Sequence, residues 1–408
     1  MTQRRRVRGH ALAAEHFVRG ALAIFALGLF MLLAATAQAA PHTFTKVADS
    51  ARDNFNPFSF TCASINNRGD VAFKAGRTSS DGLNSFDGIY RANANGTLTT
   101  IVEDPARKRF GFFSNSPSMN NLGDVSFAAN LQPNSEEAIL RGDGRKLTTI
   151  ATTEKGFNFF GFDTSVNDSG EVAFKGELDN FDEGLFSGQG RGLTTHYLNS
   201  SDVSVDGQPA RFGGNDSRPS INNLGQIAFD ESIQPEFDSG IFAGRAGSFR
   251  TIEAPDPNRS VRAPVLNDGG TAAFETTFFD ETGQFVDAIV TDSGPTQTTV
   301  ADTRGSFIAF FFRPPSINNS GEVAYGAFFD GGLSSGIFTG PDPKRDLLIA
   351  SGDKLDGATV SSGGLSFCEE GLNDSGRLAF IAQLDDPSTP TNCCPPPRTA
   401  VFVATPKR

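Results

Sequence analysis

The chain of 408 residues contains no tryptophan, three tyrosines, four histidines and four cysteines. Tryptophan and tyrosine are the amphipathic rings that usually stack on sugars, so their scarcity argues against a glycan cleft built on them. Only two histidines, His42 and His196, lie beyond residue 39. Two histidines so far apart argue against a histidine-rich metal site and against a Ser-His-Asp triad. Phenylalanine is abundant instead, at 39 residues, and supplies the core-forming aromatic side chains.

The first 39 residues have the pattern of an export signal. Five arginines accompany an apolar run over residues 21–35, and Ala37-Gln38-Ala39 gives the small-x-small pattern that a signal peptidase reads. The run is shorter than the roughly 20 apolar residues of a membrane anchor. We therefore expect residues 1–39 to be a signal peptide. Residues 40–408 should form a single exported domain, periplasmic or extracellular, without a membrane span.

Basic residues are too few for a nucleic-acid partner. Removing residues 1–39 takes five Arg and one Glu from totals of 35 basic and 47 acidic residues, which leaves a net charge of −16. Such a surface repels phosphate backbones.

A ten-residue motif recurs seven times in the exported part. The segment SINNRGDVAF begins at residue 64, and related segments begin at 118, 165, 220, 265, 316 and 371. The motif glycines are spaced by 45 to 55 residues. This period exceeds the 20–29 residues of leucine-rich solenoid coils and suits a four-stranded propeller blade.

Each repeat predicts four short strands, a to d. Strand a leads into the Asn-rich turn, and strand b follows it, as in EVAFKGEL at 171–178. Strand c is a run such as GLFSG at 184–188, and strand d a run such as LTTIV at 98–102. Gly- and Asn-rich turns fit tight hairpins between c and d. The sequence therefore predicts an all-β fold, a seven-bladed β-propeller of four-stranded antiparallel blades.

The phase of the repeats predicts how the ring closes. The last repeat ends after strand c, whereas TFTKVAD at 43–49 resembles a strand d that precedes the first strand a. Pairing residues 43–49 with 399–404 would hide two sheet edges. We expect the N-terminal strand to complete the last blade.

The motif asparagines and glycines are interpreted as structural turns. Asn side chains bond the local backbone and Gly takes a positive φ, so a motif repeated in every blade is first a folding device. A ligand or Ca²⁺ contact is the alternative. The turn residues are Asn66, Gly69, Asn120, Gly123, Asn167, Gly170, Asn222, Gly225, Asn267, Gly270, Asn318, Gly321, Asn373 and Gly376.

With these residues the chain resembles exported bacterial tandem-repeat proteins defined by an N-x-x-G-x-x-A-F repeat. Asn66, Gly69, Ala72 and Phe73 match that pattern directly, and the resemblance covers the exported part. It departs where Ser126 replaces Ala and Tyr325 replaces Phe. The resemblance implies a secreted β-propeller-like protein and no catalytic residues.

Four cysteines in an exported chain predict disulfides. Cys62 and Cys368 occupy nearly equivalent places in strand a of the first and last repeats, which a ring makes neighbours. Cys393 and Cys394 lie in the b–c loop of the last repeat. We expect two bridges, with the partners open, that tie the last blade to itself and to the first. A four-cysteine zinc site is the alternative.

Ligand binding is expected on one rim. The a–b and c–d turns are short, whereas the b–c and d–a connections share the other rim and vary, as binding loops do. Its b–c loops are acidic, at 177–184, 232–240 and 278–287, and its d–a segments hold phenylalanine clusters at 109–113, 157–162 and 307–312. Core filling and solvation explain these features most simply. Carboxylate-lined Ca²⁺ sites come next, followed by catalytic carboxylates.

The sequence thus favours a monomeric, non-enzymatic binding or interaction scaffold that uses the loop-rich rim. Its partner is an unknown protein, polymer or small ligand. No metal or cofactor is expected, with Ca²⁺ as the alternative, and no catalytic residue can be named. A secreted hydrolase or lyase with Asp or Glu at the propeller channel is one alternative, and a structural envelope or matrix component is another.

Overall fold

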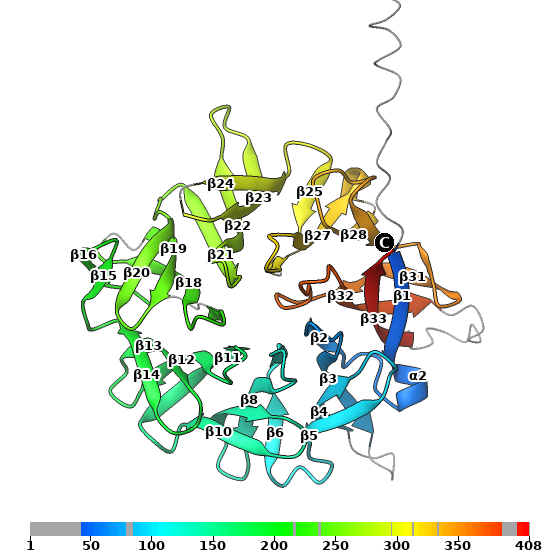
Figure 1. Cartoon of the computed structure of the whole chain (residues 1–408), viewed down its shortest axis with the longest axis horizontal. Helices are drawn as coiled ribbons and strands as arrows, with labels where there is room; N and C mark the ends of the chain where they lie inside the picture. The colour runs from blue at the N-terminus through cyan, green and yellow to red at the C-terminus, as the bar shows by residue number, and fades with distance from the viewer. Residues whose placement is uncertain are drawn as a thin grey trace, which may run out of the picture. The chain divides into compact units, whose positions relative to one another are not determined.

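The computed structural model describes residues 42–78, 85–214, 218–235, 238–294, 296–311, 314–332, 334–385 and 398–407. The expected signal peptide lies outside these residues. Seven antiparallel blades stand side by side around a central axis (Figure 1), which confirms the seven-bladed propeller.

Each blade follows the predicted order from the axis outward. The innermost strands are β2 (Thr61–Ile65), β6 (Phe110–Phe113) with β7 (Ser118–Met119), β11 (Phe157–Val166), β17 (Ser220–Ile221), β21 (Arg259–Leu266), β25 (Phe307–Phe310) with β26 (Ser316–Ile317), and β31 (Ala358–Ser366). The second strands are β3 (Val71–Thr78), β8 (Val125–Leu131), β12 (Val172–Leu178), β18 (Ile227–Ile233), β22 (Ala272–Phe279), β27 (Val323–Phe329) and β32 (Leu378–Asp385). The third strands are β4 (Ser85–Ala92), β9 (Glu136–Gly142), β13 (Glu183–Gly188), β19 (Asp238–Arg245), β23 (Phe285–Asp292), β28 (Ser334–Phe338) and β33 (Arg398–Pro406). The outer strands are β5 (Leu98–Glu103), β10 (Leu147–Thr152), β14 (Leu193–Leu198), β20 (Ser248–Glu253), β24 (Gln297–Asp302), β29 (Leu347–Ala350) and β1 (His42–Asp49).

Two blades carry additions to this plan. The hairpin of β15 (Val203–Val205) and β16 (Gln208–Ala210) extends blade four, and β30 (Lys354–Leu355) pairs with β31 in blade seven. Within the described residues, helical structure is limited to one turn at α2 (Ser50–Asp53) and a 3-10 turn at η1 (Asp330–Gly332). No helix among the described residues is long and apolar enough to cross a membrane.

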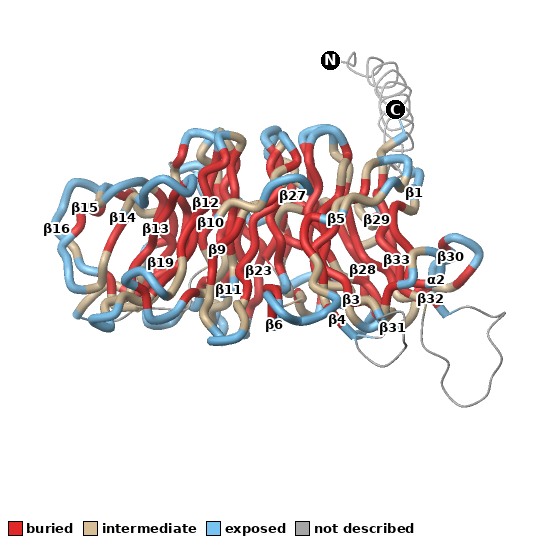
Figure 2. Tube along the Cα trace, turned by 90° about the horizontal axis from the view of Figure 1, so that it is seen from below, coloured by how far each residue is buried: buried red, intermediate tan, exposed pale blue. Residues whose placement is uncertain are grey.

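The motif residues of the second strands build the core between blades. In each blade the motif aromatic, such as Phe73 or Phe380, is buried with the apolar side chains of its own blade. The small residue before it packs into the next blade's cluster, as Ala72 does with the residues around Phe127. Figure 2 shows these buried strands between exposed turns at both rims. A larger side chain at the small position would hold the sheets apart.

The two departures from the motif have local reasons. The Ser126 hydroxyl hydrogen-bonds the Thr164 hydroxyl of the next blade at 2.9 Å. The Tyr325 hydroxyl donates to the Gly340 carbonyl within its own blade. Both polar groups are buried, so each needs such a partner.

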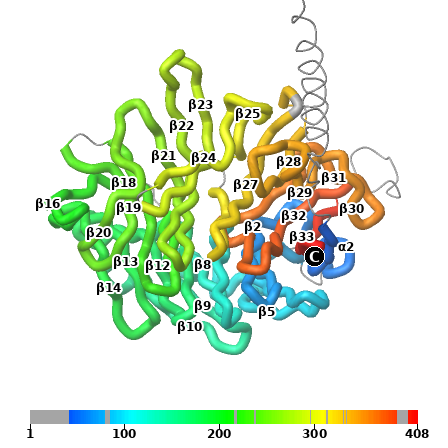
Figure 3. The backbone as a smooth tube through the Cα atoms, turned by 45° about the horizontal axis from the view of Figure 1, so that its top comes forward, coloured from blue at the N-terminus to red at the C-terminus, as the bar shows by residue number. Residues whose placement is uncertain are grey.

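The ring closes as the repeat phase predicts. β1 pairs antiparallel with β33 in blade seven, with Thr43 opposite Thr405 and Asp49 opposite Ala400. The blue N-terminal strand therefore lies beside the red C-terminal strand (Figure 3). Cys62 of blade one forms a disulfide with Cys368 of blade seven. Cys393 and Cys394 lie outside the described residues.

Candidate functional site

The Asn-rich turns are built by the first motif asparagine and the motif glycine. In blade three the Asn167 side-chain oxygen accepts the N–H groups of Ser169 and Glu171 at 3.1 and 3.0 Å. Gly170 has a φ of 76°, and a Cβ there would also meet the Arg141 side chain. The seven motif glycines all have φ between 72° and 90°. Only glycine adopts this conformation without strain.

The same asparagines also join neighbouring blades. In six blades the Nδ2 group donates to the main-chain carbonyl of its counterpart in the next blade, as from Asn120 to Asn167 at 2.9 Å. The other donors are Asn167, Asn222, Asn267, Asn318 and Asn373. In blade one Asn66 donates to Asp70 of its own turn instead. The sequence of a single turn does not predict these bonds between blades.

The second motif residue forms a closed ring around the axis. Each main-chain N–H donates to the Oδ1 atom of the counterpart in the next blade, over 2.7 to 3.0 Å, and the seventh bond returns to the first blade. We call this set the axial ring. It consists of Asn67, Asn121, Asp168, Asn223, Asp268, Asn319 and Asp374.

The axial ring never places two aspartates side by side. Every aspartate lies between two asparagines. Both neighbouring amides donate to the second oxygen of Asp268 and of Asp374, and the Asn121 amide donates to that of Asp168. Asn319 donates to both Asp268 and Asp374, at 3.0 and 3.1 Å. Amide donors offset negative charges that would otherwise crowd the axis.

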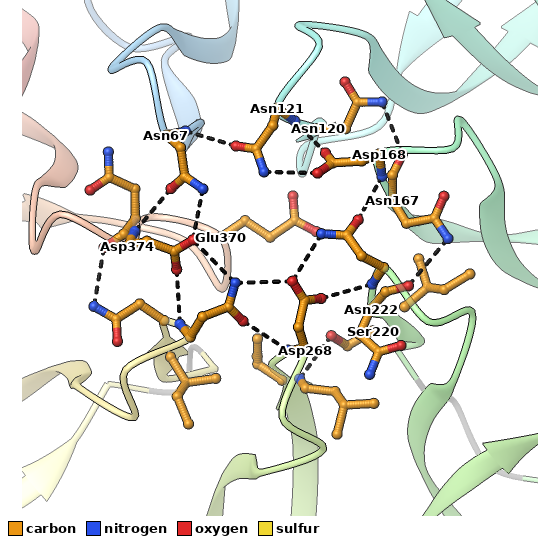
Figure 4. A pocket seen from close by; sticks show the side chains of 18 of the residues that line it. Asn67, Asn120, Asn121, Asn167, Asp168, Ser220, Asn222, Asp268, Glu370 and Asp374 are labelled. Carbon is orange, nitrogen blue, oxygen red and sulfur yellow. Dashed lines mark hydrogen bonds between the residues drawn. The ribbon is translucent and has the colours of Figure 1, made fainter.

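A cavity of about 140 Å³ opens inside this ring, on the face of the Asn-rich turns. Amide and carboxylate groups surround the cavity (Figure 4), and an apolar motif residue from every blade also lines it. The described lining residues include no Lys or Arg. Its carboxylates belong to Asp168, Asp268, Glu369, Glu370 and Asp374. The cavity therefore presents negative charge to any ligand.

Glu370 connects three blades through this cavity. Its carboxylate belongs to blade seven and accepts hydrogen bonds from the Ser118 and Ser165 hydroxyls at 2.8 and 3.0 Å. It also accepts the Met119 N–H at 3.1 Å. Burial raises the pKa of Glu370 to about 7, opposed by the serine hydrogen bonds and reinforced by the charge of Glu369. Near neutral pH this carboxyl can therefore gain or lose a proton.

Glu370 is also where the repeat changes. The other six repeats have Ala, Pro or Thr at its position, and Gly371 stands where five repeats have Ser. In four of those repeats the serine oxygen accepts a main-chain N–H of the next blade, as Ser118 does from Val166 at 2.9 Å. In the first repeat the Ser64 hydroxyl donates to the Pro117 carbonyl instead. Sequence reasoning missed Glu370. Aligning the seven repeats and looking for the residue that differs would have found it.

A buried Ser–His–Glu group in blade three does not form a hydrolase triad. Ala246 N–H donates to His196 Nδ1 at 3.1 Å, so neutral His196 carries its proton on Nε2 and donates it to Ser187 Oγ at 2.8 Å. The Ser187 hydroxyl in turn donates to Glu171 at 2.6 Å. A histidine that donates to the serine cannot accept its proton.

Glu275 and Asp287 form a buried carboxylate pair in blade five. Blades one and three place Lys74 and Lys175 at the position of Glu275 and pair each with a carboxylate. Here Arg262 supplies the positive charge at 3.4 Å. Burial and the charge of Asp287 raise the pKa of Glu275 to about 7. Both side chains are buried, which suits a shared proton better than catalysis on a substrate.

The phenylalanine clusters divide between core and surface. Phe110, Phe113, Phe157, Phe160, Phe307 and Phe310 are buried, as core filling predicts. Phe112, Phe159, Phe162 and Ile308 are exposed. The segments differ because register shifts interrupt β6, β11 and β25, so the side chains do not simply alternate.

Two of the acidic loops contain a carboxylate that binds backbone N–H groups. Asp280 Oδ1 accepts the N–H groups of Thr282 and Gln284, and Asp182 binds Ser200. One group of three potential metal-ligating residues occurs within the described chain, namely Cys62, Cys368 and Glu369. Its two sulfurs are bonded to each other.

A family model described as a family of unknown function (DUF7453) matches residues 28–393. No curated protein matches the sequence. Among solved structures, the acylaminoacyl peptidase of Pyrococcus horikoshii is 12% identical, with a TM-score of 0.49, over 80% of this chain and 50% of that one. The chain thus matches half the length of that peptidase. The polysaccharide lyase Uly1 is 8% identical, with a TM-score of 0.47, over 85% and 90% of the two chains. YCF48 bound to D1 peptide is 9% identical, with a TM-score of 0.41, over 92% and 99%. These likenesses assign no activity.

Proposed function

The protein belongs to the DUF7453 family of unknown function, and we propose that it is an exported, non-catalytic binding protein that holds a small organic cation in its axial cavity. Glu370 carries this proposal, because it leaves the repeat pattern and places a buried carboxyl group in the cavity. Burying a carboxyl group costs free energy, and the turn structure of the repeat does not explain why Glu370 is buried there.

The hydrogen-bond inventory favours a ligand with N–H donors. A carboxylate offers about four lone-pair directions. Glu370 uses three of them, for Ser118, Ser165 and Met119. Asp168 uses two, both for Asn121. The remaining acceptors carry negative charge, which suits an ammonium group. The ring amides between them disfavour a bare metal ion, since their N–H groups cannot coordinate it.

Export is supported by the N-terminal pattern and by the Cys62–Cys368 disulfide, which suits an oxidising compartment. The cavity opens on the face opposite the loop-rich rim that the sequence favours. That rim remains part of the proposed scaffold as a surface for larger partners.

A hydrolase or lyase that acts at the channel is the second candidate, favoured by the raised pKa of Glu370, which suits a general acid. Release of products from a panel of glycans, abolished by Glu370→Gln, would favour this candidate over the binding protein.

Isothermal titration with 1,4-diaminobutane tests the binding proposal. We expect binding to the wild-type protein, at least tenfold weaker binding to Glu370→Gln, and unchanged binding to Glu281→Gln, whose side chain is exposed on the other face. Tetramethylammonium, which has no N–H donor, should bind more weakly. Equal affinity of the Glu370→Gln variant, or binding of Ca²⁺ in place of the amine, would overturn the proposal.

A further inference from the structure

Exposed apolar side chains gather on one face of the propeller. Of thirteen exposed large apolar residues in the described part of the chain, nine lie in the b–c and d–a segments or in the strands next to them, and we assign these nine to the loop-rich face. These nine are Phe58, Phe112, Phe159, Phe162, Phe181, Phe279, Phe285, Ile308 and Phe328. Scattered apolar side chains need no explanation, but a concentration on one face marks an interaction surface.

Three of these rings form a cluster on the innermost strands of blades two and three. Phe112 of β6 lies 5.5 Å from Phe162 of β11, and Phe162 lies 5.9 Å from Phe159, measured between ring centroids. All three are between 37% and 44% exposed, so each has a packed edge and a free edge. We call these residues the aromatic cluster. A second exposed pair, Phe279 and Phe285 in blade five, has its centroids 5.6 Å apart.

Acidic side chains accompany both groups of rings. The b–c loop beside the aromatic cluster, residues 177–183, contains four acidic residues and no Lys or Arg. The loop between Phe279 and Phe285 contains Asp280 and Glu281, again without a basic residue. The b–c loops beside the exposed rings are therefore negative, while the d–a segments of the same face also carry the basic residues Arg107, Lys108, Arg109 and Lys155.

This combination selects among partners. Phenylalanine rings have no polar edge for sugar hydroxyls, which argues against a glycan. Carboxylates repel anionic lipids and nucleic acids, and they would repel the same face of a second copy. Aromatic anchors inside a charged rim are typical of protein interfaces.

We propose that the loop-rich face docks a polypeptide that presents apolar and basic side chains together, with the aromatic cluster as the apolar anchor and the b–c carboxylates as the rim. The inference does not depend on the axial cavity, which opens on the other face.

Fluorescence anisotropy with three labelled peptides of alternating residues tests it. A ten-residue Lys–Leu peptide should bind the wild-type protein, whereas Lys–Ser and Glu–Leu peptides should bind at least tenfold more weakly. Phe159→Ser with Phe162→Ser should weaken Lys–Leu binding tenfold or more. The matched control, Leu122→Ser with Leu224→Ser on the turn face, should leave it unchanged.

A second variant covers the case in which the aromatic variant fails to fold. Asp179→Lys with Glu281→Lys leaves the rings in place and should weaken Lys–Leu binding about tenfold. Equal binding of Lys–Ser and Lys–Leu peptides would overturn the proposal, and so would unchanged binding by both variants. Binding to anionic phosphatidylglycerol vesicles without peptide binding would overturn it in favour of a membrane. Concentration-dependent dimers abolished by the phenylalanine variant would assign the face to a second copy.

Discussion

His196 is a buried histidine whose protonation the folded protein resists. Burial, with the nearby charge of Arg245, lowers its pKa to about 4 from 6.5. Between these values the unfolded chain binds the proton and the folded chain does not, so stability is lost as the pH falls from 6.5 toward 4. For this group the loss amounts to about 3 kcal/mol at most. Urea unfolding should show that the free energy of unfolding of wild type exceeds that of His196→Gln by more at pH 7 than at pH 4.5. The same difference in the free energy of unfolding at both pH values would contradict this prediction.

Glu370 should show the opposite dependence. Its pKa is about 7 in the folded protein and 4.5 in the unfolded chain, so the folded state holds the proton more tightly. Its contribution to stability is complete below pH 4.5 and is lost as the pH rises through 7. Glu370→Gln cannot ionise and should gain stability relative to wild type between pH 5 and pH 8. A constant difference across this range would show that Glu370 keeps its ordinary pKa.

At the scale of elements, the order of Asn and Asp in the axial ring should matter more than its composition. Asn319→Asp would place three carboxylates in succession and remove two amide donors, at a cost of about 1–2 kcal/mol at low salt. Asn67→Asp creates only one adjacent pair of carboxylates and should cost less. Thermal unfolding at 20 mM and 500 mM NaCl should show both losses shrinking with salt. Equal losses, or no salt effect, would contradict the charge argument.

The blades could be predicted from sequence because each is made of local hairpins with a repeated Ala–Phe signal. The axial ring could not be, because its bonds join turns 45 to 55 residues apart and the last spans 307 residues, from Asp374 to Asn67. Such contacts depend on blade number and tilt, which no local pattern encodes. The exposed positions of Phe159 and Phe162 were missed for another reason. The register shift in β11 breaks the alternation from which burial is inferred.

At the scale of the whole molecule, two features hold blades seven and one together. β1 fills blade seven and leads into blade one, and the Cys62–Cys368 disulfide joins these blades again near the axis. Replacing both cysteines by serine should lower the free energy of unfolding by about 2–5 kcal/mol. Reducing agent should lower the melting temperature of wild type and leave the double variant unchanged. A melting temperature of wild type that does not respond to reduction would contradict a stabilising role.

Because either β1 or the disulfide can keep blades seven and one together, the losses in free energy of unfolding on removing each should not add. Removing residues 40–47 exposes the edge of β33, yet the disulfide still holds the ring. Removing the disulfide leaves β1 in place. Only when both are absent can the ring open, so the combined loss should exceed the sum of the two by at least about 1 kcal/mol. Urea unfolding of the four chains measures this coupling. Additive losses would mean that the axial ring alone keeps the propeller closed.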